Sequence, residues 1–130
     1  MTADTRTIDN EGQGIVVVAF DIESTAGVYS LTEDDIGNPV ALAANSEISD
    51  GADDETFLGK LLGVTDDGTA GLVQIRGICT GLPYSGTAPV LGWPVQMSGA
   101  GTVDKGITDG STRGFTLNVD TTAATCDVLL

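Results

Sequence analysis

Glycine recurs along this chain at a density that disfavours helices. The 130 residues include 18 glycines, which is roughly twice the usual share of about 7%. Glycine costs backbone entropy in a helix and favours turns. No run of ten residues shows a convincing 3.6-residue apolar pattern free of glycine, and the apolar residues fall in short, β-branched runs. The spacing therefore predicts an all-β chain.

About eight short strands are expected, arranged as a small β-barrel or sandwich. The strongest signal is IVVVAFDI, residues 15–22, and Asp66-Asp67-Gly68 is a good hairpin turn between two strand patterns. Residues 33–39 read as an acidic turn that Thr32 can cap as one helical turn, and 45–55 as an acidic loop. The other expected strands cover residues 27–31, 39–43, 57–64, 70–79, 94–97, 102–104, 113–119 and 125–130.

Alternation along residues 70–79 separates two faces of one expected strand. Val73, Ile75, Gly77 and Cys79 are apolar or small, so they are assigned to the core. The opposite face carries Leu72, Gln74, Arg76 and Ile78.

The chain is the length of one domain. Residues 15–130 are expected to form a single β domain, and residues 1–14 a polar N-terminal arm with Ile8 as its one apolar anchor. The arm reads either as a frayed terminus or as a segment that orders against a partner chain. The start has no apolar signal-peptide region, and the longest apolar run is too short to cross a membrane. Synthesis in a cytoplasm without export is therefore expected.

The charge balance is strongly acidic and uneven. Nineteen acidic residues face five basic ones, for a formal net charge of −14. Fifteen of the acids lie in residues 1–67 with two basic residues (net −13), and four lie in residues 68–130 with three (net −1). Binding to nucleic acid or to anionic membranes is not expected, because both kinds of binding need clustered Lys and Arg side chains. The acidity serves solubility or life in salt, or it docks the chain onto a basic surface or cations.

The residue types argue against an enzyme. The chain has no histidine, which excludes histidine-based catalytic triads and histidine metal sites. Cys79 and Cys126 lack an activating base and read as buried free thiols, although a single bridge stays open. Asp50, Asp53, Asp54 and Glu55 do not have the spacing of a calcium loop. No catalytic residue, metal ligand or cofactor is therefore assigned.

Aromatic residues are few, and three of them, Tyr84, Trp93 and Phe115, stand in the near-neutral half. Trp93, between Gly92 and Pro94, reads either as a core plug or as an interface anchor, because Trp is enriched at binding hot spots. Like charges would repel if two acidic halves met, so self-association is expected to use the near-neutral half. Tyr84 and Trp93 are the residues assigned to that contact.

The C-terminal two thirds resembles a known family. Its first half runs Gly59-Lys-Leu-Leu-Gly-Val64, an acidic turn, Gly71-Leu-Val-Gln-Ile-Arg-Gly-Ile78 and Gly81-Leu-Pro83. Its second half runs from Gly92-Trp-Pro-Val-Gln-Met through a short glycine hairpin and Arg113-Gly114 to a closing Cys126-Asp-Val-Leu-Leu130. This order of glycines and valines resembles the small head decoration (cement) proteins of tailed bacteriophages. The acidic first half departs from the usual pattern of that family.

The resemblance implies a β-barrel that assembles, often as a trimer, on the outside of a capsid. The expected partners are then the major capsid protein and further copies of this chain, and the expected location is the exterior of a virion. Contact with the capsid is assigned to the arm, at Thr5, Arg6, Thr7 and Ile8. The alternatives are another virion component, of the tail or head–tail junction, and a small ligand- or carbohydrate-binding β module.

Overall fold

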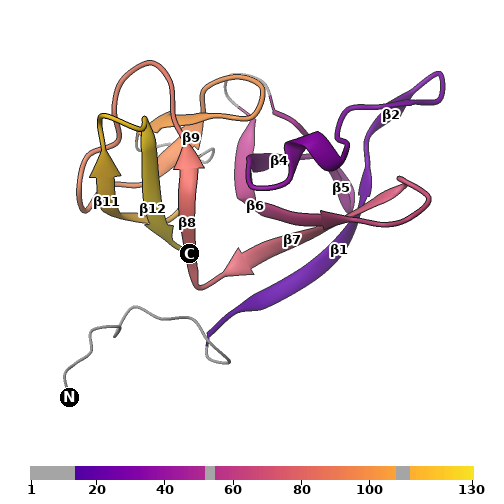
Figure 1. The fold of residues 1–130 in the computed structure, drawn as a ribbon, viewed down its shortest axis with the longest axis horizontal. Helices are drawn as coiled ribbons and strands as arrows, with labels where there is room; N and C mark the ends of the chain where they lie inside the picture. The colour runs from indigo at the N-terminus through magenta and orange to yellow at the C-terminus, as the bar shows by residue number, and fades with distance from the viewer. Residues whose placement is uncertain (1–13, 52–54, 108–111) are drawn as a thin grey trace.

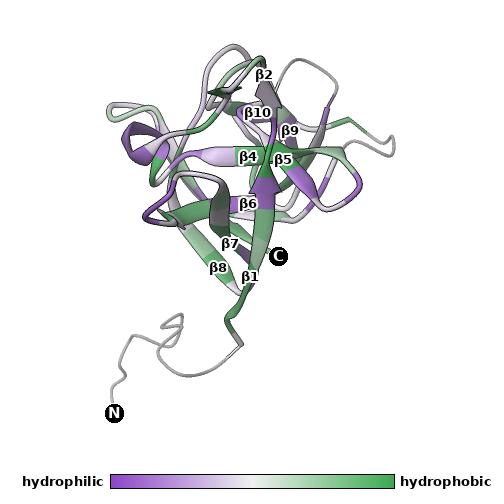
Figure 2. Cartoon of the chain, turned by 90° about the vertical axis from the view of Figure 1, so that its right-hand side faces the viewer, coloured by the Kyte–Doolittle hydropathy of each residue, from purple (hydrophilic) through white to green (hydrophobic). Residues whose placement is uncertain are grey.

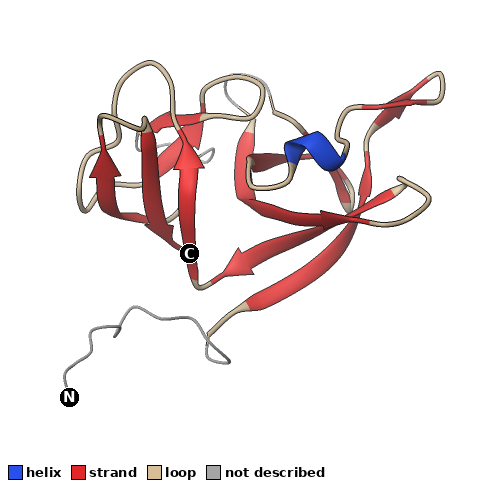
Figure 3. Cartoon of the chain, in the orientation of Figure 1, coloured by secondary structure: helices blue, strands red, loops and turns tan. Residues whose placement is uncertain are grey.

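The fold is nearly all β. A computed structural model describes residues 14–51, 55–107 and 112–130, and their one helical element is the 3-10 turn η2 (Glu33–Asp35), which Thr32 caps (Figure 3). The all-β prediction is confirmed, and the described residues hold twelve strands, several only two or three residues long, where about eight were expected. The strands are β1 (Val16–Ile22), β2 (Ser24–Thr25), β3 (Val28–Tyr29), β4 (Pro39–Ala44), β5 (Glu47–Ser49), β6 (Thr56–Val64), β7 (Ala70–Arg76), β8 (Ile78–Pro83), β9 (Val95–Met97), β10 (Val103–Lys105), β11 (Phe115–Asp120) and β12 (Thr125–Leu129).

Five strands close a barrel in the order β1-β5-β4-β6-β7. β1 and β5 pair in parallel, and the other neighbours pair antiparallel. The prediction that residues 45–55 form an acidic loop is wrong at Glu47–Ser49, which form strand β5. Ile48 within it is fully buried among the residues of the barrel interior, and this anchor holds the short strand in the barrel wall.

A second lobe lies beside the barrel (Figure 1). It consists of the sheet β11-β12-β8 and the hairpin β9-β10. The expected single strand over 70–79 is wrong, because Gly77 has a positive φ of 94° and separates β7 from β8. The chain therefore passes from the barrel into the second lobe at this glycine.

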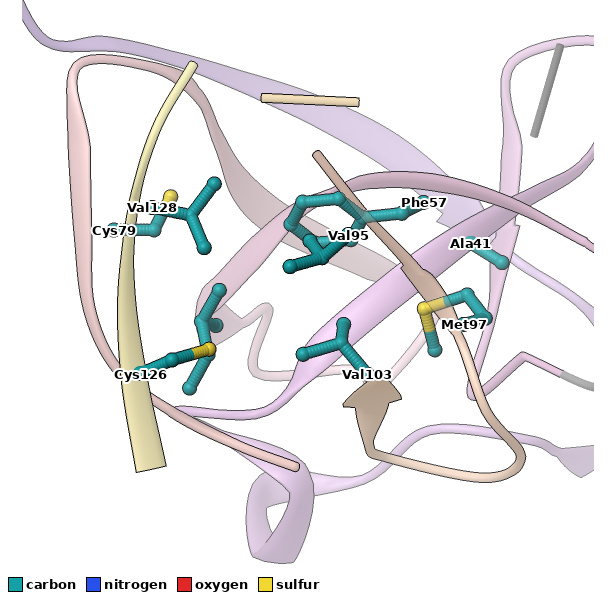
Figure 4. Packing of buried hydrophobic residues seen from close by; sticks show 9 residues of the cluster. Ala41, Phe57, Cys79, Val95, Met97, Val103, Cys126 and Val128 are labelled. Carbon is teal, nitrogen blue, oxygen red and sulfur yellow. The ribbon is translucent and has the colours of Figure 1, made fainter. Parts of the chain in front are cut away.

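Two hydrophobic clusters meet at strands β4 and β6. Val40 and Leu61 belong to the cluster inside the barrel. Ala41 and Phe57, on the same two strands, belong to the cluster of the second lobe (Figure 4). The ladder between β4 and β6 shifts its register between Val40 and Ala41, so each strand contributes side chains to both clusters.

Gln74 contradicts the simple alternation expected for β7. Its side chain is buried at 5% exposure rather than facing solvent. Its Nε2 donates hydrogen bonds to the carbonyl oxygens of Arg76 (3.2 Å) and Ile78 (3.1 Å). These carbonyls flank the break at Gly77, so the buried amide finds its acceptors in the backbone beside the break.

Candidate interaction surface

Large apolar side chains gather on the outside of the second lobe. Trp93 is 44% exposed and Leu91 is 63% exposed. We call this surface the Trp93 face, and it comprises Val90, Leu91, Trp93, Phe115 and Leu129. Exposed apolar patches of this kind on a soluble protein mark contacts with other molecules.

Backbone hydrogen bonds bring the parts of the Trp93 face together. The Trp93 amide donates to the Val90 carbonyl (2.9 Å), which closes a turn. Gly92 and Trp93 then exchange backbone hydrogen bonds with Thr116 of β11, both at 2.9 Å. The Thr116 hydroxyl also donates to the Trp93 carbonyl at 2.7 Å. These hydrogen bonds join the turn to the edge of β11.

The ring of Phe115 lies beside this turn. A Cβ atom on Gly92 would stand 3.8 Å from its Cζ atom, an ordinary van der Waals contact, so the ring lies within contact distance of the turn. Phe115 pairs directly with Leu129 across β11 and β12, which places the two side chains on one face of the sheet. The Nζ atom of Lys105 lies 4.7 Å from the centroid of the Trp93 ring, and it adds a positive charge at the border.

The surroundings of the Trp93 face carry little negative charge. The sequence 85–107, 112–119 and 125–130 holds two acidic residues, Asp104 and Asp127, and two basic ones, Lys105 and Arg113. Two copies meeting at this face would therefore avoid the repulsion that the remaining acidic surface imposes.

Arg113 holds β11 against the barrel. Its guanidinium donates to the carbonyl oxygens of Leu58 on β6 and Ile75 on β7, the latter at 2.7 Å. Its backbone amide and carbonyl pair with Val95. Burial lowers the pKa of this guanidinium from its usual value, so charge-assisted hydrogen bonds to carbonyls offset the loss of water. Sequence reasoning missed this role, because the two acceptors are backbone atoms more than 35 residues away.

We expect Arg113→Ala to lower the free energy of unfolding by about 2 kcal/mol, since hydrogen bonds to charged groups are each worth about 1.5–3 kcal/mol. The measurement is urea unfolding followed by Trp93 fluorescence. Arg76→Ala, which removes an exposed arginine of β7, is the matched control and should change stability by less than about 0.5 kcal/mol. Equal losses in both variants would contradict the role given to Arg113.

The structure separates the two aromatic residues assigned to self-association by their exposure. Trp93 is exposed, whereas Tyr84 is half-buried and packs against the hydrophobic cluster of the second lobe. Trp93 is thus the stronger anchor of the two. The arm residues assigned to capsid contact, Thr5, Arg6, Thr7 and Ile8, lie outside the described residues, as do Asp53 and Asp54.

Acidic side chains are more frequent on the barrel than near the Trp93 face. Asp21 and Glu47 stand directly opposite each other on β1 and β5, an arrangement in which like charges repel. Burial, followed by the charges of Asp35 and Glu55, raises the pKa of Asp50. The described residues contain no group of three or more Asp, Glu, Cys or His side chains that could hold a metal ion.

The two cysteines lie in the hydrophobic cluster of the second lobe as free, buried thiols (Figure 4). Burial raises the pKa of Cys79 to about 11 and that of Cys126 to about 12. Both therefore stay protonated at neutral pH, and a protonated, enclosed thiol is a poor nucleophile.

A second exposed apolar group lies on the barrel wall. It comprises Val16 and Val17 of β1, Leu62 of β6 and Leu72 of β7, each 40–45% exposed. Register shifts at Val16/Val17 and at Leu61/Gly63 break the alternation there. Figure 2 shows the apolar first half of β1 running down the outside of the barrel.

In the described part of the chain, no helix is long and apolar enough to span a bilayer.

Comparison with known proteins yields no match: no family model fits the chain, and neither a curated protein nor a solved structure is found to be similar to it.

Proposed function

We propose that this chain is a non-enzymatic capsid decoration protein, which binds the outside of a phage head and stabilises the shell by bridging capsid subunits. The Trp93 face is the observation that carries the proposal, because an exposed apolar surface on a small β protein serves contact better than chemistry. The glycine and valine pattern of residues 57–130 supports it.

The physical basis is additive contact. A shell under internal pressure is strained where its subunits meet, and a bridging protein adds buried area there. Stable interfaces bury about 1,600 Å² in total, and repetition over the shell multiplies modest affinities. The Trp93 face would join copies of this chain, with a trimer favoured. The acidic barrel and the arm, through Thr5–Ile8, would face the major capsid protein.

Purified protein mixed with DNA-emptied heads of the tailed phage that carries the gene tests the proposal. Sedimentation should show saturable, stoichiometric binding, and cryo-electron microscopy should place the density outside the shell. Docking should weaken as salt rises, because charges are screened over about 8 Å at physiological ionic strength, while self-association should change little. A chain found in tails or at the head–tail junction, and not on heads, would instead be another virion component.

A small ligand-binding module is the second candidate, favoured by one observation. A cavity of about 450 Å³ is lined by Tyr29 and several apolar residues, a volume within the usual range of ligand pockets. Retention of a sugar or other small molecule, with no binding to heads, would favour this candidate.

A further inference from the structure

The cavity noted above lies between two hairpins at one end of the barrel. One wall comes from the turn between β2 and β3, from β3 and from the start of η2, and the other from the end of β6 and the turn that joins it to β7. Figure 1 shows both hairpins at the end of the molecule away from β11 and β12. We call it the hairpin cavity. Its lining is Gly27, Val28, Tyr29, Leu31, Thr32, Glu33, Val64, Thr65, Asp66 and Gly68.

The floor of the hairpin cavity is apolar. Leu31 is 1% exposed and belongs to the cluster inside the barrel, and Tyr29 and Val64 pack against that cluster. Val28, in contrast, is 72% exposed, the largest exposed fraction among the big apolar side chains of the described residues. A molecule seated in the cavity would remove this valine from water.

The rim of the hairpin cavity is negative. Glu33 and Asp66 are both exposed on it, and no basic residue lines it. The walls are held in place without these two acids. Asp67 accepts hydrogen bonds from Thr65 and Thr69 in one turn, and Asp35 and Thr32 form the capping box of the other. The acids of the rim are thus available to a ligand, and the cavity is formed before binding, which lowers the entropic cost of association.

We propose that the hairpin cavity receives an extended, basic segment of a partner protein, with an aliphatic side chain on the apolar floor and Lys or Arg side chains against Glu33 and Asp66. Charge complementarity selects this occupant, because an apolar floor inside a negative rim on a chain of net charge −14 repels anionic ligands. The exposed Val28 favours a protein segment over a small cation, since a segment is large enough to cover it. The hairpin cavity and the Trp93 face use different residues, so either contact can fail without the other.

The probe is a short acetylated and amidated peptide of alternating lysine and leucine, titrated into ¹⁵N-labelled protein at low salt. Amide shifts should concentrate at residues 27–33 and 64–68. Peptides with glutamate in place of lysine, or serine in place of leucine, should bind at least tenfold more weakly. Butylammonium should also bind at least tenfold more weakly than the lysine–leucine peptide. If the two bind with equal affinity, the cavity is a site for a small cation and the proposal is overturned.

Variants locate the contact. Glu33→Gln combined with Asp66→Asn should weaken the lysine–leucine peptide about fivefold to tenfold, and Val28→Thr, which keeps the shape and adds a hydroxyl, about threefold to tenfold. Asp120→Asn combined with Asp127→Asn removes the same charge from β11 and β12, at the end of the molecule away from the cavity (Figure 1), and should weaken binding less than twofold. Equal weakening by both double variants would show unspecific attraction to an acidic protein, and shifts outside the cavity would show another site. Either result overturns the proposal.

Discussion

Gly59→Ala is expected to lower the free energy of unfolding by about 3 kcal/mol, the upper part of the range for overpacking. A Cβ atom on Gly59 of β6 would overlap the carbonyl oxygen of Gln74 on β7. The obstacle is backbone, which cannot rotate away as a side chain can, so β6 and β7 must separate. Because both strands belong to the closed barrel, the strain spreads into its ladder.

Gly63→Ala is the matched control on the same strand. A Cβ atom there would lie 3.6 Å from the Leu72 Cδ1 atom, an ordinary contact with the end of a side chain. Stability should change by less than about 1 kcal/mol. Urea unfolding and far-ultraviolet circular dichroism measure both variants. Equal stability of Gly59→Ala and the wild type would show that β6 and β7 do not approach as closely as the structure has them.

Trp93→Ala is expected to raise the dissociation constant of self-association at least 30-fold. Truncation of a central Trp at an interface costs about 2 kcal/mol or more, and each 1.4 kcal/mol is tenfold. Sedimentation velocity over a range of protein concentrations measures the change. Circular dichroism of Trp93→Ala should match the wild type, because the exposed ring contributes little to the core.

Other variants show which face associates. Phe115→Ala, on the Trp93 face, should also weaken the oligomer, and Tyr84→Ala tests the second aromatic residue. Neutralising Asp53, Asp54 and Glu55 together should leave the oligomer intact. An oligomer that survives Trp93→Ala and Tyr84→Ala, yet changes when the three acids are neutralised, would reverse the assignment of the two faces. A wild-type chain that stays monomeric at all concentrations would remove the Trp93 face as a self-contact.

Local pattern was enough for most of the strands. The runs that became β1, β6, β11 and β12 combine β-branched or apolar residues with turn residues at their ends, and such signals act within a few residues. The turn at Asp66-Asp67-Gly68 follows from the same local chemistry. Thr32 capping one helical turn is likewise a contact between near neighbours.

The predicted alternation of core and solvent-facing residues failed where the chain passes from the barrel into the second lobe. A period of two assumes a continuous strand, and Gly77 breaks β7 from β8. Gln74 is buried where its amide donates hydrogen bonds to two carbonyls beside that break. β5 was missed because three residues carry too little periodicity, and only the burial of Ile48 in the barrel defines the strand.

The candidate surfaces divide in the same way. The sequence by itself determined that the chain is all β, strongly acidic in its first half and nearly neutral in its second, and that Trp93 was a candidate anchor. Only the tertiary structure decided that Trp93 is exposed beside Phe115 and Leu129, that Arg113 donates hydrogen bonds to backbone carbonyls, and that two hairpins distant in the sequence line an open cavity. The physical reason is range: strand and turn preferences depend on neighbouring residues, whereas exposure and enclosure depend on which distant strands pair, and barrel closure sets that pairing.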